Sequence, residues 1–199
     1  MTKDLFNDVL NAWNQDRFAL ALLLSQRLLT ERPKFGHGLL IHGTLLYELN
    51  RFDEAEQAIR DALPLLPESS THQAYARLGH LEKDRGCFDA AECHYRRAID
   101  NAPDHPEPLI FLGSILKRTC RFDEAEKCFT AAVECTKGYK ADALLNLGYL
   151  LRSQGRFREA GVAFEQFLQT SPKHADAVDA LVAQSDVEAA LQFEIEDRG

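Results

Sequence analysis

Arg51-Phe52-Asp53-Glu54-Ala55-Glu56 occurs again, letter for letter, at Arg121-Phe122-Asp123-Glu124-Ala125-Glu126. Three blurred copies begin at Cys87, Arg156 and Arg17. The phenylalanines of the five copies are 34 to 36 residues apart along the chain. A fixed period of this length is typical of proteins that stack small, similar units. The hexamer therefore predicts a repeat architecture rather than one conventional globular core.

Each period contains two apolar patterns with helical spacing. In the stretch 36–69, one face of a first helix is predicted before Asn50, which tolerates a left-handed helix end. A second helix is predicted to start at Phe52, with Asp53 and Glu54 in its first turn. Pro64 removes a backbone donor and is expected to end this second helix early.

Small residues are predicted where the two helices of a unit cross. Gly43 faces Ala55 in this interpretation, because two small side chains let helix backbones approach closely. The same pairing is expected for Gly79 with Ala91, Gly113 with Ala125 and Gly148 with Ala160. The hexamer phenylalanines are expected to fill the space between consecutive units. The first repeat departs from the pattern, since Val9 stands where the other repeats have glycine.

At these positions the chain resembles the tetratricopeptide repeat family. The stretch Tyr75-Ala76-Arg77-Leu78-Gly79, followed by Ala91, Tyr95, Ala98 and Pro103, carries the resemblance most clearly. It implies an all-α fold, a right-handed α-α superhelix (solenoid) formed by a single array over 1–199. The helix-turn-helix units are assigned to 2–35, 36–69, 72–105, 106–139 and 141–174. A capping helix is expected at 175–195, with Val178, Leu181 and Val182 on its apolar face.

Composition excludes several classes of protein. The 199 residues are 45% hydrophobic and 27% charged, which argues against disorder. The net charge of −8 argues against nucleic acid as the main partner. No run reaches membrane-spanning length, and the first residues lack the apolar stretch of a signal peptide. Five cysteines without paired spacing fit a reducing compartment, so a cytoplasmic location is expected.

The sequence has no recognisable catalytic motif. A phosphate-binding glycine loop, His-Glu-x-x-His and Gly-x-Ser-x-Gly are all missing. Cys93 and His94 are adjacent but point to different sides of a helix, which argues against a metal site. His42 lies on an apolar face and is interpreted as a packed residue. We therefore expect no enzyme activity, no cofactor and no bound metal.

In the family that the chain resembles, the first helices of successive repeats line a concave groove that binds peptides. The groove-facing residues are expected on the face opposite the helix-packing stripe. This expectation selects Phe6, Leu10, Trp13, Ile41, Thr44, Tyr47, Arg77, His80, Lys83, Phe111, Ser114, Lys117, Asn146, Tyr149 and Arg152.

The selected set contains cations and no acid, although the protein is acidic overall. Such a surface suits an extended peptide with apolar residues at one end and acids, or a C-terminal carboxylate, at the other. The alternative is that Lys83, Lys117 and Arg152 are solvated helix ends that interact with the helix dipole. The leading hypothesis is a non-catalytic scaffold or adaptor that binds a protein segment.

A second surface competes with the groove. The second helix of the first repeat is rich in leucine, and Leu20, Leu23 and Leu24 are candidates for self-association, for example in a homodimer. The alternative is that the N-terminal tail folds back over these leucines. A regulatory subunit of a separate enzyme is a further alternative that the sequence does not distinguish from an adaptor.

Overall fold

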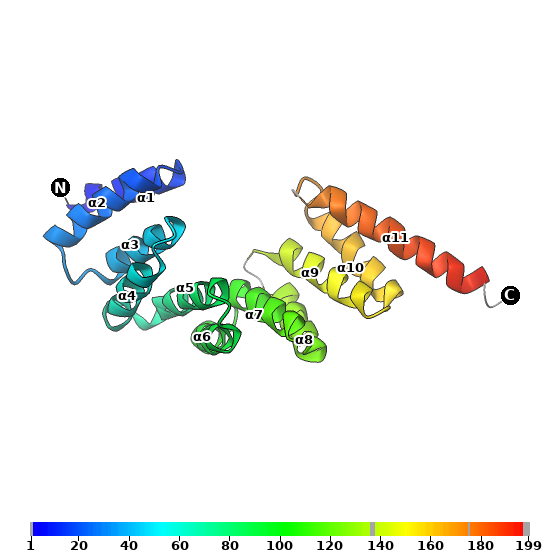
Figure 1. Ribbon diagram of the computed structural model, residues 1–199. Helices are drawn as coiled ribbons and strands as arrows, with labels where there is room; N and C mark the ends of the chain where they lie inside the picture. Colours follow the sequence, from blue (N-terminus) through cyan, green and yellow to red (C-terminus); the bar gives the residue numbers. More distant parts are fainter. Residues whose placement is uncertain (1, 136–137, 175, 197–199) are drawn as a thin grey trace. The chain divides into compact units, whose positions relative to one another are not determined.

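The computed structural model describes residues 2–135, 138–174 and 176–196, and the side chains of 5–135, 138–174 and 176–189. Within this part of the chain every regular element is a helix (Figure 1). The elements are α1 (Thr2–Asn14), α2 (Phe18–Glu31), α3 (Gly36–Glu48), α4 (Phe52–Ala62), η1 (Leu63–Leu65), η2 (Glu68–Ser70), α5 (Thr71–Asp84), α6 (Phe88–Asn101), α7 (Pro106–Arg118), α8 (Phe122–Glu134), α9 (Lys140–Ser153), α10 (Phe157–Thr170) and α11 (Ala177–Glu196).

The helices are grouped in two compact units, Met1–Ala102 and Pro103–Gly199. The first unit contains the pairs α1/α2, α3/α4 and α5/α6, and each pair packs on the next. The second unit contains α7/α8, α9/α10 and α11, which lies against α10 (Figure 1). The predicted all-α fold of five helix-turn-helix units and a last helix is confirmed.

The turn inside each helix pair has one residue in the left-handed conformation. Asp16, Asn50 and Cys120 have positive φ, as do Gly86 and Gly155, and each lies two residues before the aligned phenylalanine. The next backbone N–H then bonds a carbonyl five residues earlier, as in Arg51 N–H to Leu46 O. The break predicted at Asn50 is thus a helix cap that all five repeats share.

The helices of a pair do cross at glycine, but the partner differs from the prediction in three repeats. A Cβ placed on Gly79 or Gly148 would lie 2.6 or 2.7 Å from the ring of Tyr95 or Phe164. Gly113 has the same relation to Phe129, while Gly43 meets Ile59 and the backbone of Ala55. The ring four residues after each alanine therefore lies over the glycine, and it is fully buried.

The hexamer phenylalanines, predicted to lie between consecutive units, are not fully buried. Phe52, Phe88 and Phe157 are partly buried, and Phe122 is 36% exposed. They are the first residues of the second helices α4, α6, α8 and α10. The aromatic positions seven residues later carry the core instead, and they are Tyr95, Phe129 and Phe164.

The first repeat reverses the sizes at the helix crossing. Val9 is completely buried where the other repeats have glycine. Opposite it, α2 has Ser25 at the position that holds Ile59, Tyr95, Phe129 or Phe164 in the other repeats. A large residue on the first helix is thus matched by a small one on the second, as close packing of protein interiors requires.

The structure confirms one further prediction, at α4, and contradicts another, at α11. Helix α4 ends at Ala62 and continues as a short 3-10 turn that contains Pro64, as predicted. In α11 the prediction of the packing face is wrong, because Val178, Leu181 and Val182 are exposed. The helix packs with small residues instead, and the buried side chains are Ala177, Ala180, Ala183 and Val187.

Substitutions at two glycines of the second unit test the packing at the helix crossing. Gly148→Ala should destabilise the protein by about 1–3 kcal/mol, because the new methyl group overlaps a buried ring. Gly161→Ala should be neutral or stabilise by up to about 1 kcal/mol, since its nearest neighbour, Val187, lies at an ordinary 3.4 Å and alanine favours a helix. Urea unfolding followed by circular dichroism measures both, and equal effects would contradict this account.

Candidate functional site

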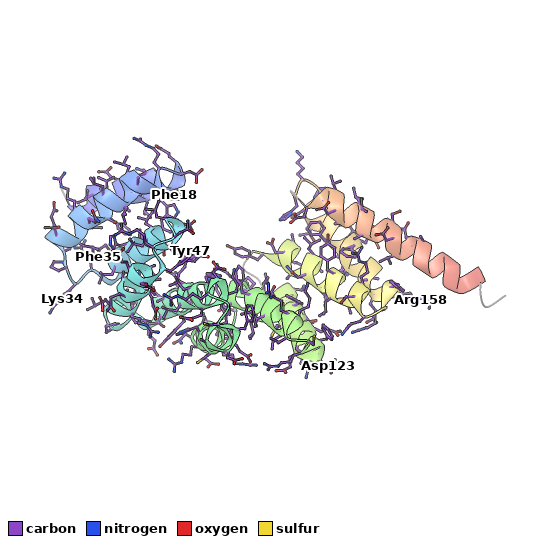
Figure 2. The ribbon with its side chains drawn as sticks, viewed as in Figure 1. Phe18, Lys34, Phe35, Tyr47, Asp123 and Arg158 are labelled. Carbon is purple, nitrogen blue, oxygen red and sulfur yellow. The ribbon has the colours of Figure 1, made fainter. Side chains whose placement is uncertain are left out.

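The clearest polar cluster on the first helices of the first unit joins α3 to α5. The hydroxyl of Tyr47 donates a hydrogen bond to the carboxylate of Asp84. The Nζ atom of Lys83 lies 3.1 Å from the same carboxylate. Tyr47 also packs against the ring of Phe52, with the centroids 5.8 Å apart (Figure 2 labels Tyr47). Two predicted groove residues, Tyr47 and Lys83, are therefore brought together around an acid.

Burial and charge set the protonation of this cluster. Burial and the hydrogen bond to Asp84 raise the pKa of Tyr47, while the positive charge of Arg77 acts in the opposite direction. Burial alone would raise the pKa of Asp84, but hydrogen bonds from Tyr47 and Lys83 lower it on balance. The hydroxyl of Tyr47 is therefore protonated at neutral pH and donates to Asp84, which is ionised.

Two other predicted groove residues lie in the core. Thr44 is 2% exposed, and its hydroxyl donates to the carbonyl of Leu40 at 2.9 Å. His80 is 6% exposed and shares a hydrogen bond of 2.8 Å with the hydroxyl of Tyr95. A ligand on this face could reach either side chain only after a local rearrangement.

The predicted groove residues around the first two repeats are largely apolar and partly buried. The ring of Phe6 meets that of Phe35 edge to face, with centroids 5.2 Å apart (Figure 2 labels Phe35). Trp13 and Ile41 pack against the core of the first unit, and Leu10 is partly buried. Each of these side chains is therefore only partly accessible to a ligand.

In the second unit the predicted groove residues of α9 face acids from α11. The guanidinium of Arg152 lies 3.3 Å from the carboxylate of Asp186 and 5.5 Å from the ring centre of Tyr149. Burial raises the pKa of Tyr149, and the negative charge of Asp179 adds to the rise. The C-terminal helix therefore already supplies a carboxylate to a predicted groove cation.

The remaining predicted groove residues of the second unit are partly buried. Ser114 donates to the carbonyl of Ile110 at 2.9 Å, and the side-chain amide of Asn146 donates to the carbonyl of Asp142 at 2.8 Å. Phe111 and Lys117 lie on the same helix as Ser114. The amide and hydroxyl therefore each make one bond within their own helix and keep further hydrogen-bonding capacity.

The sequence analysis missed the two acids, Asp84 and Asp186. Asp84 follows a selected position by one residue, at the end of α5. Asp186 is found by extending the period by 34 residues from Arg152 into α11. The selected positions include neither the residue that follows Lys83 nor any residue of α11, so both acids lie outside the set.

Arginines link consecutive repeats within each unit. Arg85 donates to Glu56 at 2.5 Å and to Asp53 at 2.7 Å. Arg156 donates in the same way to Glu126, at 2.5 Å. Glu56 and Glu126 are the last letters of the two identical hexamers, so this acid joins neighbouring repeats rather than only starting a helix.

The leucine-rich helix α2 is mostly covered. Leu20 and Leu24 pack against the core of the first unit. Leu23 is 61% exposed, so one of the three candidates for self-association is accessible. A second apolar surface is an open crevice of about 360 Å³ between α8, α9 and α10, lined by Val133, Leu144, Leu147, Leu151 and Val162 with glutamates at its edge.

A polar pair, with Ser25 fully buried and His42 partly buried, joins α2 to α3. Ser25 is fully buried, donates to the carbonyl of Leu22 at 2.7 Å, and lies 2.8 Å from Nδ1 of His42. Burial lowers the pKa of His42, and the nearby Arg51 lowers it further. His42 is thus neutral at pH 7 and holds two helices together.

The described residues include no group of three or more His, Cys, Asp or Glu side chains placed to hold a metal ion. Their helices are also too short or too polar to span a membrane. The predicted groove residues that remain accessible are aromatic, amide and charged side chains on the first helices, and they are partly exposed. Chemically, such side chains can bind a peptide backbone and its charged groups.

The sequence matches the tetratricopeptide repeat family over residues 8–70, 76–140 and 112–175. Among curated proteins, it is 29% identical over 129 residues to the TPR repeat-containing protein MJ1428 of Methanocaldococcus jannaschii. That match covers 65% of this chain and 22% of the relative, so the chain spans less than a quarter of that relative.

Solved structures show the same fold at lower identity. The Cut9-Hcn1 hetero-tetramer of APC/C superposes with a TM-score of 0.77 at 20% identity, over 94% of this chain and 36% of that one. YrrB, described as a TPR protein with an unusual peptide-binding site, superposes with a TM-score of 0.62 at 19% identity. The match covers 88% of this chain and 89% of YrrB.

Acid should destabilise the first unit through its histidines. Burial lowers the pKa of His42 and of His94 below the ordinary value of 6.5. Between 6.5 and the lower folded pKa, the unfolded chain binds more protons, so stability falls as pH falls. Thermal unfolding at pH 7.5 and 5.5 should show this loss, and His42→Asn with His94→Asn should reduce it. An unchanged pH dependence in the double variant would contradict the assignment.

Proposed function

The chain belongs to the tetratricopeptide repeat family, and we propose that it is a non-catalytic scaffold or adaptor that binds an extended peptide segment. Proteins of this family generally act as scaffolds for protein interactions. The bound segment would lie on the first helices and carry acidic residues or a C-terminal carboxylate. Because the cysteines suit a reducing compartment, we place this scaffold in the cytoplasm.

One observation supports the proposal. The partly exposed side chains of the first helices differ between repeats, whereas the residues at the helix crossing are similar. The glycine–aromatic crossing recurs in α5/α6, α7/α8 and α9/α10. From α3 to α9 one outward position of the first helices changes from aromatic to cationic, and its residues are Tyr47, Lys83, Lys117 and Arg152. Variation confined to partly exposed positions on a rigid scaffold is typical of a recognition surface.

The contacts inside the protein favour a carboxylate as ligand. Asp84 interacts with Tyr47 and Lys83, and Asp186 interacts with Arg152. These positions therefore already bind carboxylates supplied by the chain itself. An incoming acidic peptide would exchange with exposed carboxylates, whose ion pairs contribute little to stability and are screened by salt.

Self-association through the first repeat has weaker support. Leu20 and Leu24 pack inside the first unit, and one exposed leucine is an ordinary feature of a protein surface. YrrB, a structural neighbour at 19% identity, is described as having a peptide-binding site, which agrees with the proposed class of ligand.

Substitution of the cations tests the proposed site. The probe is a synthetic peptide with two leucines, three glutamates and a free C-terminal carboxylate. Changing Lys117 and Arg152, which lie in the same compact unit, together to alanine should weaken its binding at least about fivefold, because each lost contact to a carboxylate contributes roughly 0.5–1 kcal/mol or more. Isothermal titration calorimetry at low and high salt measures the loss.

The matched control removes the same charge from second helices. Lys127 and Arg158 are exposed on α8 and α10 of the same unit, and their double alanine variant should bind the peptide as the wild type does (Figure 2 labels Arg158). Equal affinities of the two double variants, with circular dichroism unchanged in both, would show that the peptide does not bind on the first helices of the second unit.

A further inference from the structure

Helix α11 repeats the register of a first helix. Shifting α9 by 34 residues aligns Ala143 with Ala177 and Arg152 with Asp186. In the structure, α11 packs on α10 as α9 packs on α8, and Asp186 reaches Arg152. Helix α11 therefore takes the place of the first helix of a sixth unit within the second compact unit.

The face of α11 that would receive a second helix is apolar and exposed. Under the same shift, Val178, Leu181 and Val182 align with Leu144, Leu147 and Gly148. Gly148 lies under the ring of Phe164 from α10, and Leu144 and Leu147 line the crevice beside it. In α11 the corresponding side chains are 68%, 55% and 57% exposed.

The size of Val182 restricts which residues of a second helix can pack on this face. In the repeats with glycine at this position, the second helix supplies an aromatic ring or isoleucine. In the first repeat, Val9 replaces glycine and α2 supplies Ser25, one turn after Ala21. A helix that packs on Val182 therefore needs small residues four positions apart, as α2 has.

The acids around this face further restrict which helix can bind it. The apolar face lies on the side of α11 opposite the buried alanines, between Glu188 on one flank and Asp179 and Asp186 on the other. The sequence of α11 contains no lysine or arginine. Two copies of α11 packed face to face would bring these acids together, which disfavours a second copy of the chain as the occupant.

We infer that the Val178–Leu181–Val182 face of α11 is a docking site for a basic amphipathic helix of a partner protein. The helix carries two small residues four positions apart, which cross Val182, and lysines or arginines that meet the flanking acids. Such binding completes a sixth helix pair and buries the apolar face. Asp186 borders both this face and the proposed peptide site, but the docking face is formed by the apolar side chains of α11, and neither proposal depends on the other.

The chain itself provides the probe. A fluorescein-labelled peptide with the sequence of residues 17–32, acetylated and amidated, has the alanine–serine pair and three arginines against one glutamate. Fluorescence anisotropy should show that it binds the intact chain. The same peptide with Ser25→Phe should bind at least about tenfold more weakly, because the ring overlaps Val182. Equal binding of the two peptides would overturn the inference.

Variants of the protein locate the binding. Leu181→Asp should weaken peptide binding at least about tenfold, and the matched variant Leu23→Asp, at an exposed leucine of α2, should leave it unchanged. Both positions are exposed, and circular dichroism should confirm that both variants fold. Unchanged binding by Leu181→Asp would overturn the site. Sedimentation velocity without peptide should show a monomer, whereas a dimer that Leu181→Asp dissociates would identify a second copy as the occupant and overturn the proposed partner helix.

Discussion

The crossing of two helices at a glycine is the constraint on which the rest of this structure depends. Because Gly79, Gly113 and Gly148 have no side chain, a ring of the second helix can lie directly against the backbone of the first. The buried ring and the close approach fix the distance between the helices of a pair. The partly exposed positions of the first helices can then vary, because the close approach at the glycine does not depend on them.

The same constraint explains what the sequence could predict. The period, the helix pairs, the left-handed turn at Asn50 and the early end of α4 before Pro64 all follow from local rules of helix formation and capping. The identity of the packing partner did not follow. A pattern of small residues shows that helices approach closely, but the side chain that fills the remaining space depends on rotamers and on the neighbouring pair.

The candidate site was predictable in position and less so in charge. Helical geometry selected Tyr47, Lys83 and Arg152, which all lie at the ends of first helices in the structure. It could not show that Asp84 reaches Tyr47 or that Asp186 reaches Arg152, because these contacts join residues 37 and 34 positions apart. Electrostatics at a surface depends on which side chains meet, whereas periodicity reports only which face each one is on.

The rule of complementary sizes also decides how α11 should be regarded. Val9 with Ser25 shows that a large residue at the crossing is tolerated when the opposite residue is small. Val182 has the size of Val9 but has no such partner among the described residues, and it lies in an exposed apolar strip. A helix whose only task was to cap the array would be expected to expose polar residues there, because a cap shields the last repeat from water. The buried alanines of α11 perform the capping, and the valines and leucine on its other side have the size pattern of a helix crossing. Helix α11 therefore combines the end of one packed array with the first half of another helix pair.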